Sequence, residues 1–183
     1  MRIALVCPYS LSRPGGVQGQ VLSLAAALQG SGHDVAVLAP VDGPVATPHL
    51  APGTVVGLGR SLPVPANGSV APIGLGPAGA RRAVATVRHM AADVVHLHEP
   101  LVPGAGYACL VASSAPKVGT FHRAGSSTAY RLLRPAVRWL AGHLDTRCAV
   151  SPEAADTARQ ALGGTYDIVG NGVELDRFAD AAP

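Results

Sequence analysis

The residues best placed for chemistry are two adjacent glycines, Gly15 and Gly16, which stand between an apolar run and a segment of helical periodicity. Glycine has no Cβ, so a ligand can approach its backbone closely. The N-terminus of a helix offers unpaired backbone N–H groups and about half a positive charge. Together these features favour a phosphate group at the pair. A plain tight turn between a strand and a helix explains the same residues, and the glycine pair alone does not decide between the two.

The dinucleotide-binding motif is a specific alternative that the spacing argues against. That motif is G-x-G-x-x-G directly after the first strand, with an acidic residue at the end of the second strand. Here the glycines fall at positions 15, 16 and 19, well beyond the apolar run that ends at Cys7. The second apolar run ends in Ala39-Pro40, without an acid at its tip. We therefore expect no NAD site.

Four polar residues at the ends of two later apolar runs could hold a metal ion. His96, His98 and Glu99 end one run, and His122 directly follows the run Lys117–Phe121. Imidazole and carboxylate ligands suit zinc or iron. In a strand, however, His96 and His98 point to one side and Glu99 to the other, and no second acid lies nearby in the sequence. We predict no metal site, assign His96 to the core and keep His122 as the candidate for catalysis.

Apolar runs of strand length alternate with helical segments, and this alternation predicts the fold. Such an order is typical of a Rossmann-like, doubly wound α/β fold, in which helices cover both faces of a parallel sheet of, here, about six or seven strands. Ligands bind such sheets at the carboxyl ends of the strands, where the glycine pair and His122 would lie. The expected strands are Ile3–Cys7, Asp34–Ala39, Thr54–Val56, Leu62–Val64, Asp93–His98, Lys117–Phe121, Thr146–Val150 and Tyr166–Val169. The expected helices are Val17–Gly30, Pro77–Ala92, Val102–Ser113, Ser126–Gly142 and Pro152–Leu162.

One predicted helix, Pro77–Ala92, carries arginines on a single face. At about 100° per residue, Arg81, Arg82 and Arg88 lie together, opposite an apolar face. A solvated polar face is one interpretation of this pattern. The other is a peripheral contact with the inner face of a membrane, through the phosphates of anionic lipids. The sequence leaves both open.

The composition restricts the class of protein. With 183 residues and 48% apolar content, the chain can bury one real core and is not disordered. Its formal net charge is +3, without a lysine-rich run or basic–aromatic interleaving, so we expect no nucleic-acid partner. Cys7, Cys109 and Cys148 are far apart and show no C-x-x-C spacing. This pattern, with a first apolar run too short for a signal peptide, predicts reduced thiols and a cytoplasmic location.

Short motifs in a fixed order give the chain a resemblance to a known family. Each motif is weak alone, but the ordered set is specific and spans almost the whole chain. The motifs are Pro8-Tyr9, Pro14-Gly15-Gly16-Val17-Gln18, Asn67-Gly68-Ser69-Val70, His96-Leu97-His98-Glu99-Pro100, Thr120-Phe121-His122, Leu133-Arg134-Pro135, Ala149-Val150-Ser151 and Asn171-Gly172-Val173. The set resembles the N-terminal domain of retaining GT-B glycosyltransferases, and most of all the phosphatidylinositol mannosyltransferases of actinobacteria.

The resemblance implies roles for individual residues. His122 would be the catalytic residue, which contacts the transferred sugar and steadies charge near the departing diphosphate. The donor phosphate and the reacting centre would lie at Gly15 and Gly16. The acceptor would be bound by Tyr9, Gln18, Asn67 and Glu99. No cofactor is expected, and the donor substrate would be a nucleotide sugar, GDP-mannose.

The resemblance also implies a division of the protein. Residues 1–170 would form the acceptor-side domain, and residues 171–183 would begin the connection to a C-terminal donor domain, whose acidic E-x7-E motif is not in this sequence. Near Asn67 the chain departs from the family's pattern, with Ala66 in place of an aromatic residue and Pro72-Ile73 in place of arginines. The acceptor is therefore left open between a lipid-linked and a small polar molecule. A non-catalytic phosphate- or glycan-binding module of the same fold is the alternative function.

Overall fold

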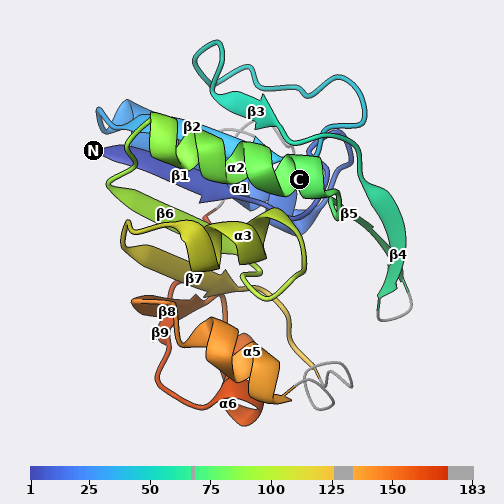
Figure 1. The fold of residues 1–183 in the computed structure, drawn as a ribbon, viewed down its shortest axis with the longest axis vertical. Coiled ribbons are helices and arrows are strands. Elements are labelled where there is room, and N and C mark those ends of the chain that lie inside the picture. Colours follow the sequence, from blue (N-terminus) through green and yellow to red (C-terminus); the bar gives the residue numbers. More distant parts are fainter. Residues whose placement is uncertain (67–68, 126–133, 173–183) are drawn as a thin grey trace, which may run out of the picture.

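A seven-stranded parallel sheet forms the centre of the molecule, in the strand order β3-β2-β1-β6-β7-β8-β9 (Figure 1). It is seen in a computed structural model that describes residues 1–66, 69–125 and 134–172. The sequence prediction of a parallel sheet of this size is confirmed. The strands of this sheet are β1 (Arg2–Val6), β2 (Asp34–Ala39), β3 (Val55–Gly57), β6 (Val94–His98), β7 (Lys117–Phe121), β8 (Thr146–Ala149) and β9 (Asp167–Ile168).

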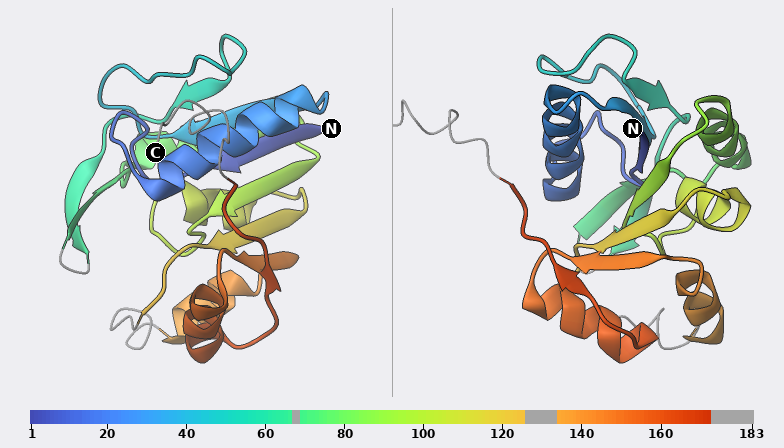
Figure 2. Two further views of the ribbon diagram at one scale, coloured as in Figure 1. Left: turned by 180° about the vertical axis from the view of Figure 1, so that it is seen from behind. Right: turned by 90° about the vertical axis from the view of Figure 1, so that its left-hand side faces the viewer.

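Helices lie on both faces of the sheet, as the alternating pattern predicts. In the right-hand view of Figure 2, α1 covers one face, while α2, α3 and α5 cover the other. The buried apolar residues form two clusters, one beneath α1 and one shared by the remaining helices. The described helices are α1 (Gly16–Gly30), α2 (Pro77–His89), α3 (Ala105–Ala112), α5 (Arg134–Ala141) and α6 (Pro152–Leu162). None of them has the length and apolar content needed to span a bilayer.

Helix α1 places the glycine pair at the carboxyl end of β1. Gly15 is the N-cap residue with an extended backbone, and Gly16 is the first residue of the helix. The helix is held to the sheet by Val21 and Ala25, which are fully buried against β1 and β2. It ends where Gly32 adopts a positive φ of 82°. The predicted strand, glycine loop and helix are confirmed.

A two-stranded antiparallel hairpin, β4 (Leu62–Ala66) and β5 (Ser69–Ile73), stands beside the main sheet and differs from the sequence prediction. Only Leu62–Val64 was expected as a strand, because prolines disfavour strand assignments. In the register, however, Pro63 and Pro72 face each other. The carbonyl of Pro72 points away from the hairpin and accepts the N–H of Ser10 at 2.9 Å. Prolines are tolerated here because the outer edges of a two-stranded ribbon do not need a full ladder, and among the described residues β5 is met at its outer edge only by the short segment around Tyr9.

Two further differences concern helix boundaries. Helix α3 begins at Ala105 and not at Val102, because Gly104 in front of it has a φ of 118° that no helix can include. The helix expected over Ser126–Gly142 is described only as α5, since residues 126–133 lie outside the described residues. Asn67 also lies outside them, so its predicted role at the acceptor stays a prediction.

The close packing of α2 yields a first test of this fold. A Cβ added at Gly79 would lie 2.2 Å from the carbonyl oxygen of Leu58, a backbone atom that cannot move aside easily. We expect Gly79→Ala to lower the free energy of unfolding by about 1–3 kcal/mol, the usual range for overpacking. Urea denaturation monitored by circular dichroism measures it.

Gly19, inside α1, is the matched control for that substitution. A Cβ there would meet nothing within 4 Å. Gly19→Ala should therefore leave the stability unchanged or raise it by about 0.5–1 kcal/mol, the difference between the two residues within a helix. Equal effects of the two substitutions would contradict the described position of α2.

Candidate active site

Three neighbouring strands bring the predicted site residues to one edge of the sheet. Strand β6 lies between β1 and β7, and all three are parallel. Their carboxyl ends therefore meet at the same edge. The glycine loop follows β1, His98 and Glu99 end β6, and His122 follows β7. Segments that are far apart in the sequence thus lie together at one edge of the sheet, and they form the candidate site.

A row of three histidines runs along the sheet face toward this edge. The rings of His96 and His98 are stacked with centroids 4.4 Å apart. His98 Nδ1 lies 3.0 Å from His122 Nε2, and His96 Nε2 lies 2.7 Å from Thr120 Oγ1. Within the described residues, no group of side chains has the arrangement of a metal site. The row is thus a hydrogen-bonded cluster, which sequence reasoning did not assemble.

Burial keeps these histidines neutral. It lowers the pKa of His122 to about 4 from an ordinary value of 6.5. Burial, together with the neighbouring His122, lowers the pKa of His96 to about 4, and the pKa of the almost fully buried His98 is lowered as well. At neutral pH, His122 therefore acts as an uncharged hydrogen-bonding group.

Glu99 connects the ends of β6 and β7 from inside the protein. Its side chain is only 5% exposed, and Oε1 accepts the backbone N–H of His122 at 2.7 Å. Its backbone has a φ of 48°, which is uncommon for a residue other than glycine. Burial raises the pKa of the carboxyl group, and the hydrogen bond from His122 opposes this effect. One carboxylate oxygen thus holds the catalytic candidate, while contact with an acceptor stays a prediction.

The glycine loop is partly covered by a side chain that the sequence assigned to the acceptor. Gln18 is 7% exposed and its Nε2 lies 3.4 Å from the carbonyl oxygen of Ser10. A Cβ added at Gly15 would come within 2.3 Å of Gln18 Oε1, whereas one at Gly16 would meet nothing within 4 Å. Gly16 therefore has the open approach that a phosphate needs. Tyr9, before the loop, forms a bridge with Ile73 of β5.

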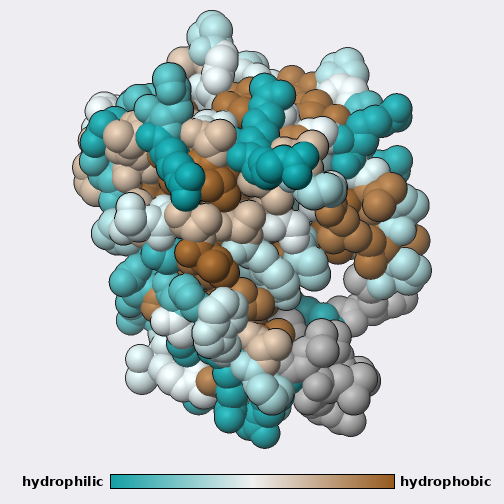
Figure 3. All heavy atoms as spheres, viewed as in Figure 1, coloured by the Kyte–Doolittle hydropathy of each residue, from teal (hydrophilic) through white to brown (hydrophobic). Residues whose placement is uncertain are grey.

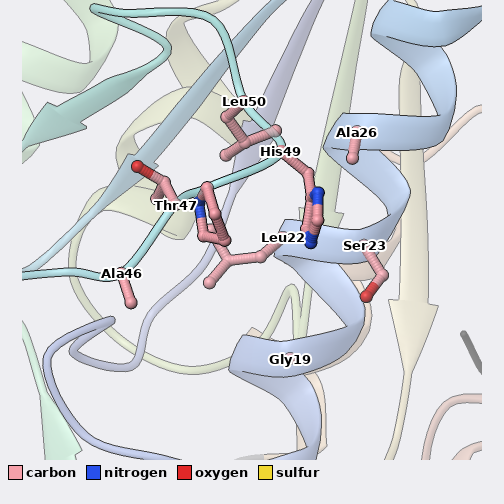
Figure 4. Close-up of a pocket in the computed structure, with 9 residues that line it drawn as sticks. Gly19, Leu22, Ser23, Ala26, Ala46, Thr47, His49 and Leu50 are labelled. Atoms are coloured by element: carbon pink, nitrogen blue, oxygen red, sulfur yellow. The ribbon is translucent and has the colours of Figure 1, made fainter. Parts of the chain in front are cut away.

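Two cavities lie on opposite sides of α1. One, of about 230 Å³, lies against the sheet and is lined by the three histidines and by apolar residues of α1, including Leu24 and Leu28. The other, of about 330 Å³, lies between α1 and the segment 46–50 (Figure 4). In that view His49 extends toward Leu22 and Ser23. No predicted site residue lines the second cavity, whereas His122 lines the first.

The arginine face of α2 is at the surface, away from the sheet. Arg81, Arg82 and Arg88 are exposed, while Ala83 and Val87 are buried against the core. Figure 3 shows hydrophilic side chains gathered over α2. The arginines are available to a partner, and their contact with a membrane stays a prediction.

Solved structures with the same architecture define the class of protein. An alpha-glucosyltransferase in complex with UDP-glucose and DNA superposes with a TM-score of 0.62 at 13% identity, over 99% of this chain and 45% of that one. Anabaena HepE in complex with UDP-glucose superposes with a TM-score of 0.60 at 17% identity, over 97% of this chain and 46% of that one. These likenesses show a Rossmann-like half of the GT-B fold.

The sequence comparison then identifies the family. The model of Glycosyltransferase Family 4 matches residues 14–177, and the chain belongs to this family. Proteins named phosphatidyl-myo-inositol mannosyltransferase are similar along the whole chain. The one from Mycolicibacterium smegmatis is 41% identical over 99% of this chain and 46% of its own length, and the one from Mycobacterium tuberculosis is 42% identical over 100% and 47%. The chain spans about half the length of the curated relatives it matches.

The neutral histidines yield a test by pH. Between pH 6.5 and about 4 the unfolded chain binds protons at histidines that stay neutral in the folded protein, as for His96 and His122. The unfolded state then holds more protons, so stability is present above this range and is lost as the pH falls through it. Each such histidine contributes up to about 1.4 kcal/mol per pH unit.

His96→Leu isolates one of these contributions. Urea denaturation at several pH values between 7 and 5 should show a smaller slope of the free energy of unfolding against pH in the variant. The difference in slope should correspond to the uptake of up to about one proton on unfolding. An identical pH dependence in the two proteins would mean that His96 titrates alike in the folded and unfolded chains.

Proposed function

We propose that this chain forms the acceptor-side domain of a retaining mannosyltransferase that takes mannose from GDP-mannose and transfers it to a lipid-linked acceptor of the phosphatidylinositol class. The observation that carries the proposal is that the open Gly16 backbone follows β1 and the anchored His122 follows β7, at the same edge of the parallel sheet. The names of the curated relatives support mannose and the inositol lipid. The bound UDP-glucose of the structural neighbours supports a nucleotide sugar as donor.

The glycine loop suits the diphosphate of the donor. The N–H groups at the start of α1 point out of the helix, and the helix dipole favours negative charge at this end. The first turn of α1 holds no acidic residue that would repel an anion. As the sugar leaves, negative charge builds up on the diphosphate, and these fixed N–H groups stabilise it without reorganising.

His122 suits the sugar. It is held at its ring by His98 and at its backbone by Glu99, so its position is fixed before a substrate arrives. A neutral, preorganised imidazole can hydrogen-bond a sugar hydroxyl without attracting the diphosphate away from the glycine loop. Tyr9, Gln18, Asn67 and Glu99 would bind the acceptor.

Substitution of His122 tests the proposal. In the intact enzyme, His122→Ala should lower kcat for transfer of radiolabelled mannose from GDP-mannose to phosphatidylinositol by roughly 10²-fold or more, if the side chain acts in the transition state. His89→Ala, an exposed histidine on α2, is the control and should leave kcat unchanged. Transfer at the normal rate by His122→Ala would return His122 to a structural role. Binding of GDP-mannose without transfer to any acceptor would favour the alternative, a binding module.

We also propose that the protein works at the inner face of the cytoplasmic membrane, held by the arginine face of α2. An arginine near an anionic surface contributes about 1 kcal/mol, so three would change partitioning by a factor of about 150 if all reach the headgroups. The apolar face of α2 is packed into the core, with Ala83 and Val87 buried. Binding should therefore be peripheral and sensitive to salt, since exposed charges are screened over about 8 Å at physiological ionic strength.

Vesicle co-sedimentation tests this contact. The intact protein should sediment with anionic vesicles at low salt, less at high salt, and not with neutral vesicles. Replacing Arg81, Arg82 and Arg88 together by Gln should abolish most of this binding, whereas Arg60→Gln, at an exposed arginine outside α2, should not. Equal sedimentation of the triple variant and the parent would leave these arginines as an ordinary solvated surface.

A further inference from the structure

His98 is a buried histidine to which neither the family nor the sequence motifs gave a role of its own. It is 2% exposed, and its Nδ1 lies 3.0 Å from Nε2 of His122. Its other ring nitrogen, Nε2, has no hydrogen-bond partner among the described residues. A buried polar atom without a hydrogen-bond partner lowers the stability of the fold. We therefore expect the His98 ring to carry its proton on the nitrogen that keeps this loss smallest.

Two neutral histidines can share this hydrogen bond in two ways. If His122 donates its Nε2–H, then His98 must carry its own proton on Nε2, as a buried N–H group without an acceptor. If His98 donates its Nδ1–H, then its Nε2 carries only a lone pair. Orphaned N–H groups are the rarer defect in folded proteins, so the second arrangement is favoured.

We propose that His98 is a positioning residue for His122. His98 donates its Nδ1–H to Nε2 of His122, and the proton of His122 therefore lies on Nδ1. This proposal rests on the proposed function, because it assigns the atom with which His122 meets its substrate. That atom is Nδ1 of His122. It donates its N–H, so its partner in the substrate must be an oxygen of the sugar or of the phosphate. His122 Nε2 is occupied by His98 and is closed to the substrate.

The surrounding contacts support a positioning role. Glu99, the next residue along the chain, holds the backbone N–H of His122 at 2.7 Å, so consecutive residues fix the ring and the main chain of His122. The ring of His96 stacks on the His98 ring, and His96 is itself fixed by Thr120. The His98 ring therefore has little freedom to rotate and exchange its two nitrogens.

Nuclear magnetic resonance of the histidine rings tests the proposal directly. The intact protein is labelled with ¹⁵N-histidine, and a two-bond ¹H–¹⁵N correlation spectrum reports which nitrogen of each ring carries the proton. His122→Gln identifies the signals of His122. We expect the proton of His122 on Nδ1 in the parent protein. In His98→Leu the proton should be shared with Nε2, because the donor that occupies this atom is gone.

Two variants control for indirect effects. His89→Ala removes an exposed histidine on α2, and it should leave the tautomer of His122 unchanged. His98→Asn keeps an amide N–H near the position of Nδ1 and should preserve the tautomer. A proton on Nε2 of His122 in the parent, or an unchanged tautomer in folded His98→Leu, would overturn the proposal. If His98→Leu does not fold, the spectra of the parent and His98→Asn decide.

Kinetics separate this proposal from the proposed function. Among folded variants, His98→Leu should lower kcat for mannose transfer about tenfold, the order expected for the loss of one orienting hydrogen bond, with KM for the donor little changed. His98→Asn should recover most of this rate, and His89→Ala should stay close to the parent. If the parent transfers no mannose, the proposed function fails, while the tautomer of His122 still confirms or refutes the arrangement of the two rings.

Discussion

The site depends on the hydrogen bond between the Glu99 carboxylate and the backbone N–H of His122, which joins the ends of β6 and β7. A carboxylate that is 5% exposed has lost most of its hydration, and it persists in the interior only where N–H donors replace water. The bond therefore fixes the main chain directly after β7. The left-handed backbone of Glu99 turns its side chain from the strand direction toward the neighbouring strand end. Together with the contact between the rings of His98 and His122, this bond holds His122 in position.

Much of the fold follows from local patterns in the sequence. The run Ile3–Cys7 and the spacing of Val21 and Ala25 predict β1 and α1 because a strand and a helix bury residues at different periods. The hairpin β4–β5 was not predicted in full, since its prolines suppress the strand signal and only the pairing of Pro63 with Pro72 shows why they fit. Gly104 could have marked the late start of α3, because glycine often precedes a helix where the backbone turns sharply.

Sequence reasoning named the members of the candidate site but not the contacts between them. His122 and the glycine pair are found from their place after apolar runs and from family motifs. The bond between His98 and His122 depends on the register of β6 against β7, which sets His98 opposite Thr120. A shift by one residue would move His98 to the other face, and no local pattern specifies the register of two parallel strands that are linked through a helix. Burial, and with it the neutral state of the histidines, follows only from that assembly.

The attachment of the hairpin to the glycine loop links the two halves of the substrate site. Ser10 N–H donates to the carbonyl of Pro72, and Gly74 N–H donates to the carbonyl of Pro8, so β5 is fastened to the segment that leads into Gly15 and Gly16. A molecule that shifts the hairpin would also shift the amides to which the proposed function assigns the donor phosphate. Occupancy of one proposed subsite would then change the affinity at the other, and thermodynamic linkage requires the effect to be equal in both directions. In the proposed enzyme, the hold on the activated sugar would therefore depend on whether the molecule that receives it is already in place.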